Sequence, residues 1–246
     1  MDEVVVSIPA IGLAARYSLW IGMGSAAAPR LLVEGKLRAP PVAERLVRRP
    51  RVDGLLAAMI ERYPAVFVIA TAGAGKTTAL VQAAALIDRP LAWLTLGDGD
   101  VAPGRLLEYL AAAIGAHVPA AAGLARKAMA AGVPHVEVAG LLVERVRDER
   151  LLLVLDEAEH IVDSPGSVAV VDALFQYTPD GLRVAVASRR ELPLDPGALR
   201  LAGRAGRIDE GDLALSEDEV TQALRTLGVD LDRARCWTPR ADGWRE

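Results

Sequence analysis

The sequence predicts an α/β protein, a three-layer fold in which a parallel sheet lies between two layers of helices. Short apolar runs of strand length alternate along the chain with longer segments of helical periodicity. The run at residues 151–155 is an uninterrupted series of Leu and Val, which is typical of a strand covered on both faces. Two apolar runs end in small or acidic residues, at the strand ends where open α/β sheets bind ligands.

The composition fits one large α/β domain and part of another. The chain has 246 residues, 52% of them hydrophobic and only 4% aromatic, so Ala, Leu and Val must build the core. The formal net charge of -4 argues against a broad nucleic-acid-binding surface within these residues. One cysteine, Cys236, excludes an internal disulfide, and no apolar stretch is long enough to span a bilayer. We expect a cytoplasmic protein with no membrane partner.

The first 62 residues are expected to hold one helix. Residues 1–35 are interpreted as a poorly ordered N-terminal extension, because their acidic start does not suit a secretory signal. A Pro-rich segment at 36–41 is expected to be extended, and apolar periodicity predicts a helix over 52–62. Between them lies the basic turn Val47-Arg48-Arg49-Pro50-Arg51. Its arginines either form a solvated turn or frame a nucleotide from the N-terminal side.

A strand expected at 66–71 leads into a loop of small residues and a helix from 76 to about 87. The loop and the helix start read Thr71-Ala72-Gly73-Ala74-Gly75-Lys76-Thr77-Thr78. Backbone N–H groups of such a loop cradle a polyphosphate, and the helix N-terminus adds its positive end. Lys76 supplies a mobile cation, and the Thr77 hydroxyl is a candidate Mg²⁺ ligand. The pattern predicts a P-loop NTPase fold that binds ATP or GTP.

One position departs from the GxxxxGK[ST] pattern. Ala70 stands where the first glycine belongs. Alanine is the smallest replacement, so the loop is expected to keep its shape provided that φ at Ala70 is negative. The alternative interpretation is an ordinary strand–turn–helix with a chance Gly-Lys-Thr.

One strand and three helices are expected next. The strand covers 91–96, with Trp93 packed in the core, and it ends in the turn-rich segment 97–100. Alanine-rich helices are expected at 103–115, 119–131 and 136–148.

The strand at 151–156 ends in two adjacent acids, Asp156 and Glu157. A carboxylate at this edge, beside a phosphate loop, can hold the Mg²⁺ shell, usually through water. We therefore assign Asp156 to the metal and Glu157 to the polarisation of an attacking water. The alternative is that the two acids merely begin a helix, where carboxylates favour the helix dipole.

A helix near 168–177 and a strand over 183–188 complete the expected sheet. The strand ends in Arg189 and Arg190, and a basic residue there can reach a γ-phosphate and report its presence. The alternative is a solvated arginine pair. The three histidines have no ligand spacing, so none is assigned to a metal. Ser216 and Glu219 form a capping box for a helix over 216–228.

In this order the motifs resemble the ATPase module of the maltose-regulon activator (MalT) family, large LuxR-type transcriptional regulators among the STAND signal-transduction ATPases. The ordered series is far more specific than any single motif, and it covers about residues 36–246. The matching segments are 36–41, 47–51, 71–78, 92–100, 105–110, 154–157, 187–189, 213–219 and 242–244.

The resemblance implies a nucleotide switch with ATP or ADP and Mg²⁺ as cofactors. In this family ADP holds a closed monomer, an inducer with ATP favours an open form that self-associates, and hydrolysis resets the switch. Val47 and Arg49 match the family's nucleotide-contacting segment, and Arg189 matches its sensor arginine. Catalysis is thereby assigned to Lys76, Glu157 and Arg189. The preference for ATP over GTP rests on the resemblance alone.

The resemblance also implies the organisation of the chain. Residues 36–208 are expected to form the P-loop ATPase core, and 209–246 the beginning of a helical lid subdomain. Family members continue past the position of Glu246 through a winged-helix region, a helical-repeat sensor and a C-terminal helix-turn-helix. A small-molecule or protein inducer and DNA are expected to bind only those further regions. His160 lies one residue later than the family's histidine, so no role is transferred to it.

Three other classes are alternatives. A nucleotide-binding scaffold without turnover would keep the same site. An AAA-type remodelling ATPase needs an arginine finger, for which Arg204 and Arg207 are the candidates. A small-molecule kinase needs a basic lid over a second substrate, whereas the acid pair after the strand at 151–156 suits an activated water.

Overall fold

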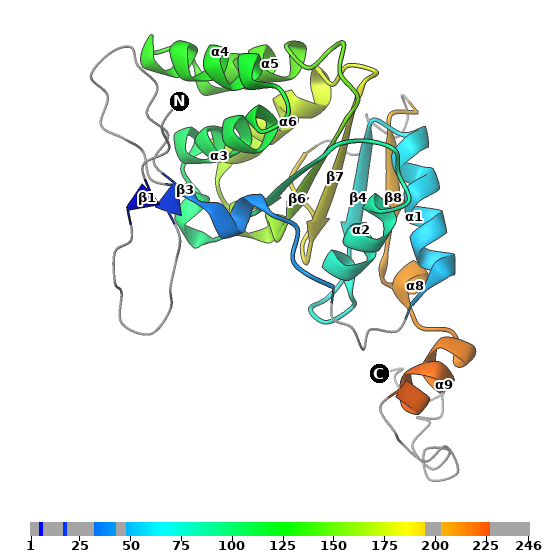
Figure 1. Cartoon of the computed structure of the whole chain (residues 1–246). Coiled ribbons are helices and arrows are strands. Elements are labelled where there is room, and N and C mark those ends of the chain that lie inside the picture. Colours follow the sequence, from blue (N-terminus) through cyan, green and yellow to red (C-terminus); the bar gives the residue numbers. More distant parts are fainter. Residues whose placement is uncertain (1–4, 7–16, 19–31, 43–47, 195–202, 227–246) are drawn as a thin grey trace.

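A parallel sheet forms the centre of the molecule, and helices cover both of its faces (Figure 1). The computed structural model describes residues 5–6, 17–18, 32–42, 48–194 and 203–226. The strand order is β5-β6-β7-β4-β8, and every neighbouring pair is parallel. Parallel neighbours need long crossovers, which the helices between the strands provide. The predicted fold class, a three-layer α/β protein with a parallel sheet, is confirmed.

The strands of this sheet are β4 (Ala65–Ile69), β5 (Leu91–Thr95), β6 (Leu151–Asp156), β7 (Leu182–Ser188) and β8 (Ala205–Ile208). The described helices are α1 (Pro50–Arg62), α2 (Lys76–Ala84), α3 (Pro103–Gly115), α4 (Pro119–Ala130), α5 (His135–Glu144), α6 (Pro165–Gln176), α8 (Glu210–Leu213) and α9 (Glu217–Thr226). Short 3-10 turns are η1 (Glu34–Leu37), η2 (Asp98–Asp100) and η3 (Ala158–Ile161). A second, antiparallel sheet consists of β1 (Val5–Val6), β2 (Tyr17–Ser18) and β3 (Leu32–Val33).

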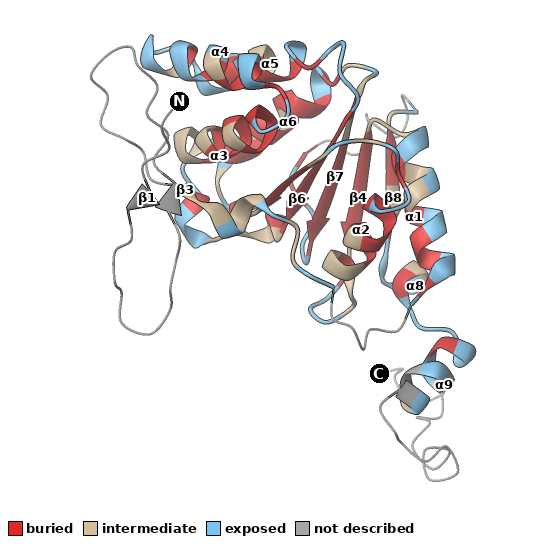
Figure 2. Ribbon diagram, viewed as in Figure 1, coloured by how far each residue is buried: buried red, intermediate tan, exposed pale blue. Residues whose placement is uncertain are grey.

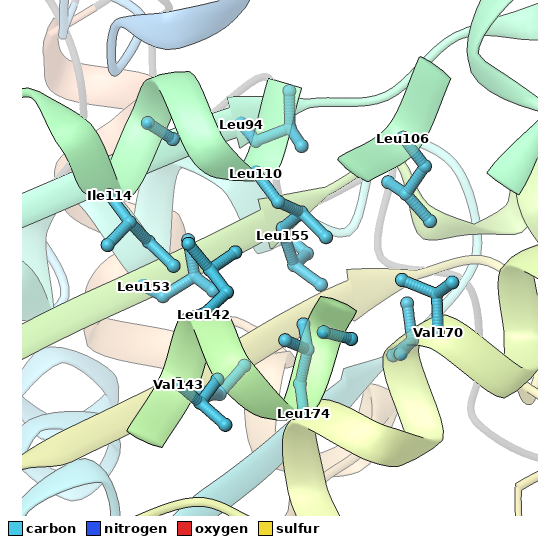
Figure 3. Close-up of a cluster of buried hydrophobic side chains, with 14 of the residues drawn as sticks. Leu94, Leu106, Leu110, Ile114, Leu142, Val143, Leu153, Leu155, Val170 and Leu174 are labelled. Atoms are coloured by element: carbon cyan, nitrogen blue, oxygen red, sulfur yellow. The ribbon is translucent and has the colours of Figure 1, made fainter. Parts of the chain in front are cut away.

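Alternation along the strands divides the core into two halves, because successive side chains point to opposite faces. On one face, Leu94 and Leu153 belong to a cluster that includes residues of α3, α4, α5 and α6 (Figure 3). On the other face, Val66, Val68 and Trp93 pack with α1 and α2. The strands are buried almost throughout (Figure 2). The uninterrupted apolar runs in the sequence are explained by this double coverage.

Most elements lie where the sequence predicts them, and Trp93 is buried as expected. One strand was missed, because β8 reads Ala-Gly-Arg-Ile and lacks an apolar run. It pairs with β4, and Gly206 lets α1 approach: a Cβ there would lie 2.6 Å from Met59 Cε. The helix expected from 76 to about 87 ends earlier, at Ala84, where turns formed by the N–H groups of Leu86 and Ile87 take over.

The last described elements, α8 and α9, follow the sheet. The Ser216 N–H donates to Glu219 Oε2 (2.9 Å) and the Glu219 N–H to Ser216 Oγ (3.2 Å), so the predicted capping box is confirmed. The proposed division at residue 208 stays a prediction. So does the poorly ordered extension, since most of residues 1–31 lie outside the described residues, as do Val47 and 242–244. No helix in the described part of the chain has the length and apolar character that a bilayer crossing needs.

Candidate nucleotide-binding site

Two glycines shape the loop between β4 and α2. Gly73 and Gly75 have φ values of +83° and +82°, in the left-handed region that glycine adopts at little cost. Glu157 is the one non-glycine residue with positive φ in the described part of the chain, so φ at Ala70 is negative, as predicted. Gly75 is also the N-cap of α2, whose first-turn N–H groups have no partner within the helix. This backbone has the form of an anion-binding loop.

Lys76 is folded back onto the loop. Its Nζ donates to the carbonyl oxygens of Ala70 (2.8 Å) and Thr71 (2.9 Å), and the residue is only 9% exposed. Neutral carbonyls are weaker partners for an ammonium group than the charged oxygens of a phosphate. The ammonium group therefore lies where a polyphosphate in the loop can take it over.

Thr77 and Asp156 meet across the site. The Thr77 hydroxyl lies 2.9 and 3.1 Å from the two carboxylate oxygens of Asp156, at the end of β6. Burial raises the pKa of Asp156 above its usual value, against the lowering effect of hydrogen bonds from Thr77 and the Glu157 N–H. A buried carboxylate beside a hydroxyl is an oxygen donor set of the kind that Mg²⁺ prefers. These two residues therefore fit the predicted metal role.

Glu157 has an unusual backbone. Its φ and ψ are 56° and 39°, a left-handed conformation that is costly for a glutamate. The side chain is partly exposed at the mouth of the site, and its Oε2 lies 3.8 Å from His160 Nε2. His160 Nδ1 in turn lies 2.7 Å from Asp98 Oδ1. Backbone strain of this kind persists where the surrounding structure holds it in place, and such residues cluster at active sites.

Both arginines after β7 are held in ion pairs. Arg189 Nε lies 2.9 Å from Glu159 Oε1, and the Arg189 N–H donates to Glu159 Oε2 at 3.1 Å. Arg190 binds both carboxylate oxygens of Asp163. The alternative of a simply solvated pair is therefore wrong. The partner Glu159 was missed, because no local pattern links it to Arg189, 30 residues away.

The motif residues surround one open cleft of about 350 Å³. The residues that line it are Ala72, Gly73, Gly75, Lys76, Thr77, Thr78, Asp156, Glu157, Glu159 and Arg189. Two residues of the predicted loop are not part of the lining. The Thr71 hydroxyl instead donates to Glu210 Oε1 in α8 (2.7 Å), and the carbonyl of Ala74 faces Arg49.

Arg49 lies behind the loop and is buried, with 6% of its surface exposed. Its guanidinium donates to the carbonyl oxygens of Leu213 (2.8 Å), Gly75 (3.1 Å) and Ala74 (3.4 Å). It is absent from the residues that line the cleft. For Arg49, the interpretation as a solvated turn is therefore wrong, because all three of its bonds go to buried or half-buried backbone. Arg48, its neighbour, is exposed.

The sheet and the loop at its carboxyl edge define a P-loop ATPase fold. The fold is shared with a Signal Transduction ATPase with Numerous Domains (STAND) protein of Pyrococcus horikoshii that has a tetratricopeptide repeat sensor. The superposition has a TM-score of 0.53 at 15% identity, and it covers 82% of this chain and 27% of that one. At this identity the likeness shows the fold alone.

The sequence is similar to the HTH-type transcriptional regulator MalT. The Cronobacter sakazakii protein is 29% identical over 196 residues, 78% of this chain and 21% of MalT. The Vibrio cholerae protein is 27% identical over 220 residues, 86% of this chain and 24% of MalT. The chain thus spans about a fifth to a quarter of the length of these relatives, and no family model matches it. The resemblance predicted from the ordered motifs is confirmed.

Proposed function

We propose that this chain is the ATP-binding switch module of a MalT-like, LuxR-type transcriptional regulator, and that it hydrolyses ATP slowly. The observation that carries the proposal is the meeting of four groups in one cleft: the glycine-shaped loop, Lys76, the Thr77–Asp156 pair and Glu157. Each comes from a separate part of the chain's motif series, and together they match what a bound Mg-nucleotide needs.

The residues divide the work of binding and hydrolysis. Backbone N–H groups of residues 72–78 surround the phosphates, and Lys76 leaves its two carbonyl partners to bind them. Thr77 and Asp156 hold Mg²⁺, which when bound neutralises phosphate charge. Glu157 orients and polarises the attacking water. Arg189 reaches the γ-phosphate by exchanging its Glu159 partner for a phosphate oxygen.

The switch requires that ATP and ADP favour different conformations. In our proposal residues 36–208 form the ATPase core and 209–246 begin the lid, with ADP stabilising a closed monomer and ATP an open, self-associating form. The inducer and DNA bind regions present in the longer relatives. The protein acts in the cytoplasm.

A second candidate function is a scaffold that binds nucleotide without turnover. One observation favours it: Glu159 neutralises the arginine expected to sense the γ-phosphate, through two contacts of 2.9 and 3.1 Å. If that pair persists in the nucleotide complex, Arg189 cannot contribute to hydrolysis.

Release of labelled phosphate from γ-labelled ATP, together with calorimetric titration, separates the two functions. Wild type is expected to bind Mg-ATP and to release phosphate slowly. Glu157→Gln keeps the size of the side chain and removes its charge, so it should bind Mg-ATP equally well and lose about a hundredfold or more in turnover. Binding without turnover in both proteins would favour the scaffold. Absence of binding by a folded wild-type protein would refute both.

A further inference from the structure

Arg49 makes its contacts from the side of the phosphate loop away from the cleft. Its Nη2 donates to the carbonyl oxygen of Gly75, and its Nη1 lies within 3.4 Å of that of Ala74. Arg49 is the N-cap residue of α1, so a helix fixes its backbone while its planar guanidinium reaches two successive loop carbonyls. Two adjacent peptide groups of the loop are thereby held by one side chain.

Peptide geometry gives these two bonds a consequence inside the cleft. In a trans peptide the C=O and the N–H point in opposite directions. The carbonyl of Ala74 shares its peptide with the N–H of Gly75, and the carbonyl of Gly75 shares its peptide with the N–H of Lys76. A guanidinium that holds both carbonyls behind the loop therefore turns both N–H groups away from itself. Gly75 and Lys76 both line the cleft.

The fit of Arg49 against the loop depends on glycine at position 75. A Cβ added there would lie 2.8 Å from Arg49 Nη2, closer than real contacts of this kind come. Position 75 therefore favours glycine for two separate reasons, its left-handed φ and the approach of the guanidinium.

The same guanidinium also reaches α8. Its shortest bond, 2.8 Å, goes to the carbonyl oxygen of Leu213, at the last residue of that helix. Arg51 adds bonds to the neighbouring carbonyls of Asp212 (3.1 Å) and Ala214 (2.8 Å), but it makes none of its described bonds to the loop. Arg49 is thus bonded to the phosphate loop and to α8 at once, whereas Arg51 is bonded to the α8 side.

We propose that Arg49 is a positioning residue that aims the N–H groups of Gly75 and Lys76 at the phosphates and links the phosphate loop to α8. It acts through the backbone and does not touch the nucleotide. The inference rests on the proposed function of the cleft, and it differs from the direct nucleotide contact that the family resemblance implies for this segment.

Affinities for Mg-ADP and for inorganic pyrophosphate test the positioning role, because pyrophosphate has no base or ribose. Arg49→Met should weaken both ligands by about tenfold or more, since buried hydrogen bonds to a charged group are lost. Arg48→Met is the matched control, an exposed neighbour that should change neither affinity more than about twofold. If ADP is weakened while pyrophosphate is not, Arg49 contacts the nucleoside and the proposal is wrong. If neither is weakened, the proposal is equally wrong.

Arg49→Lys guards against a variant that fails to fold. Lysine keeps the charge but lacks the planar fork, so the loss should be smaller than for Met and again equal for the two ligands. Unequal losses would contradict the proposal. A wild-type protein that binds neither ligand would refute the proposed function itself, and so would be told apart from a failure of this inference.

Hydrogen exchange of the Leu213 and Ala214 amides tests the link to α8. Pyrophosphate should slow their exchange in wild type and in Arg51→Met, because Arg49 still connects the loop to this helix. The response should be absent in the Arg49 variants. A response that survives in the Arg49 variants would show that the coupling takes another route.

Discussion

The phosphate loop after β4 and the acidic tip after β6 follow two buried strands of one sheet, yet they reach left-handed backbone in different ways. The loop does so at Gly73 and Gly75, where no side chain opposes it. The tip does so at Glu157, next to the buried carboxylate of Asp156. In the loop, residue type and backbone agree, and the ligands are main-chain groups. At the tip the proposed function needs side chains, so conformational strain and a buried charge persist there.

The largest effect is expected in the loop, where Lys76→Ala should weaken Mg-ADP binding by about a hundredfold or more. The ammonium loses charged bonds to the phosphates, each worth about 1.5 to 3 kcal/mol. Lys127→Ala, an exposed lysine on α4, should leave the affinity unchanged. Calorimetric titration measures both. An affinity for Lys76→Ala within about threefold of wild type would separate the loop from binding and break the comparison.

Alanine substitution at the two loop glycines should destabilise the protein unequally. Gly73→Ala carries only the left-handed φ, since nothing lies within 4 Å of the added Cβ, and should cost about 1 to 2 kcal/mol. Gly75→Ala also meets Arg49 Nη2 at 2.8 Å and should cost about 1 to 3 kcal/mol more. Urea denaturation gives both values. Equal losses would show that Arg49 yields freely.

At the tip, Asp156→Asn should stabilise the nucleotide-free protein at neutral pH by about 1 kcal/mol, because it removes a buried charge. The same change should abolish the Mg²⁺ dependence of nucleotide binding. Equilibrium denaturation and titration with and without Mg²⁺ measure the two effects. A loss of stability would mean that the carboxylate is better compensated than its burial indicates.

The pH dependence of that difference follows from the raised pKa of Asp156. Below the ordinary value of 3.8 the carboxyl is protonated in both the folded and the unfolded states, and wild type and Asn variant should be about equally stable. As the pH rises through the raised folded-state pKa, the native wild type must hold a buried charge and loses stability relative to the variant. A difference that shrinks with rising pH would contradict this account.

Glu157→Asn should give the smallest effect, a stabilisation of about 0.5 to 1 kcal/mol, because asparagine tolerates the left-handed region better than glutamate. Glu149→Asn, at an exposed position without positive φ, should not stabilise. Thermal unfolding compares them. If Glu157→Asn stabilises and also lowers ATP turnover, the strain at the tip is retained for the side chain.

Local patterns explain what the sequence alone could reveal. The bounds of α3, the strands β5 and β6, the loop and the Ser216–Glu219 capping box all follow from periodicity or short motifs. What escaped prediction are contacts between distant segments. Arg49 and Leu213 lie 164 positions apart, and nothing near either one announces the partner. The strand β8 was missed for a related reason, since its place depends on pairing with β4 and not on its own four residues.

Calorimetric titration of the folded chain with Mg-ATP tests the central claim, that the cleft binds a nucleotide polyphosphate through loop amides and Lys76. The account predicts saturable heat with one site per chain in wild type, and its loss in Lys76→Ala. A folded wild-type protein that gives no heat of binding with Mg-ATP or Mg-ADP would contradict it.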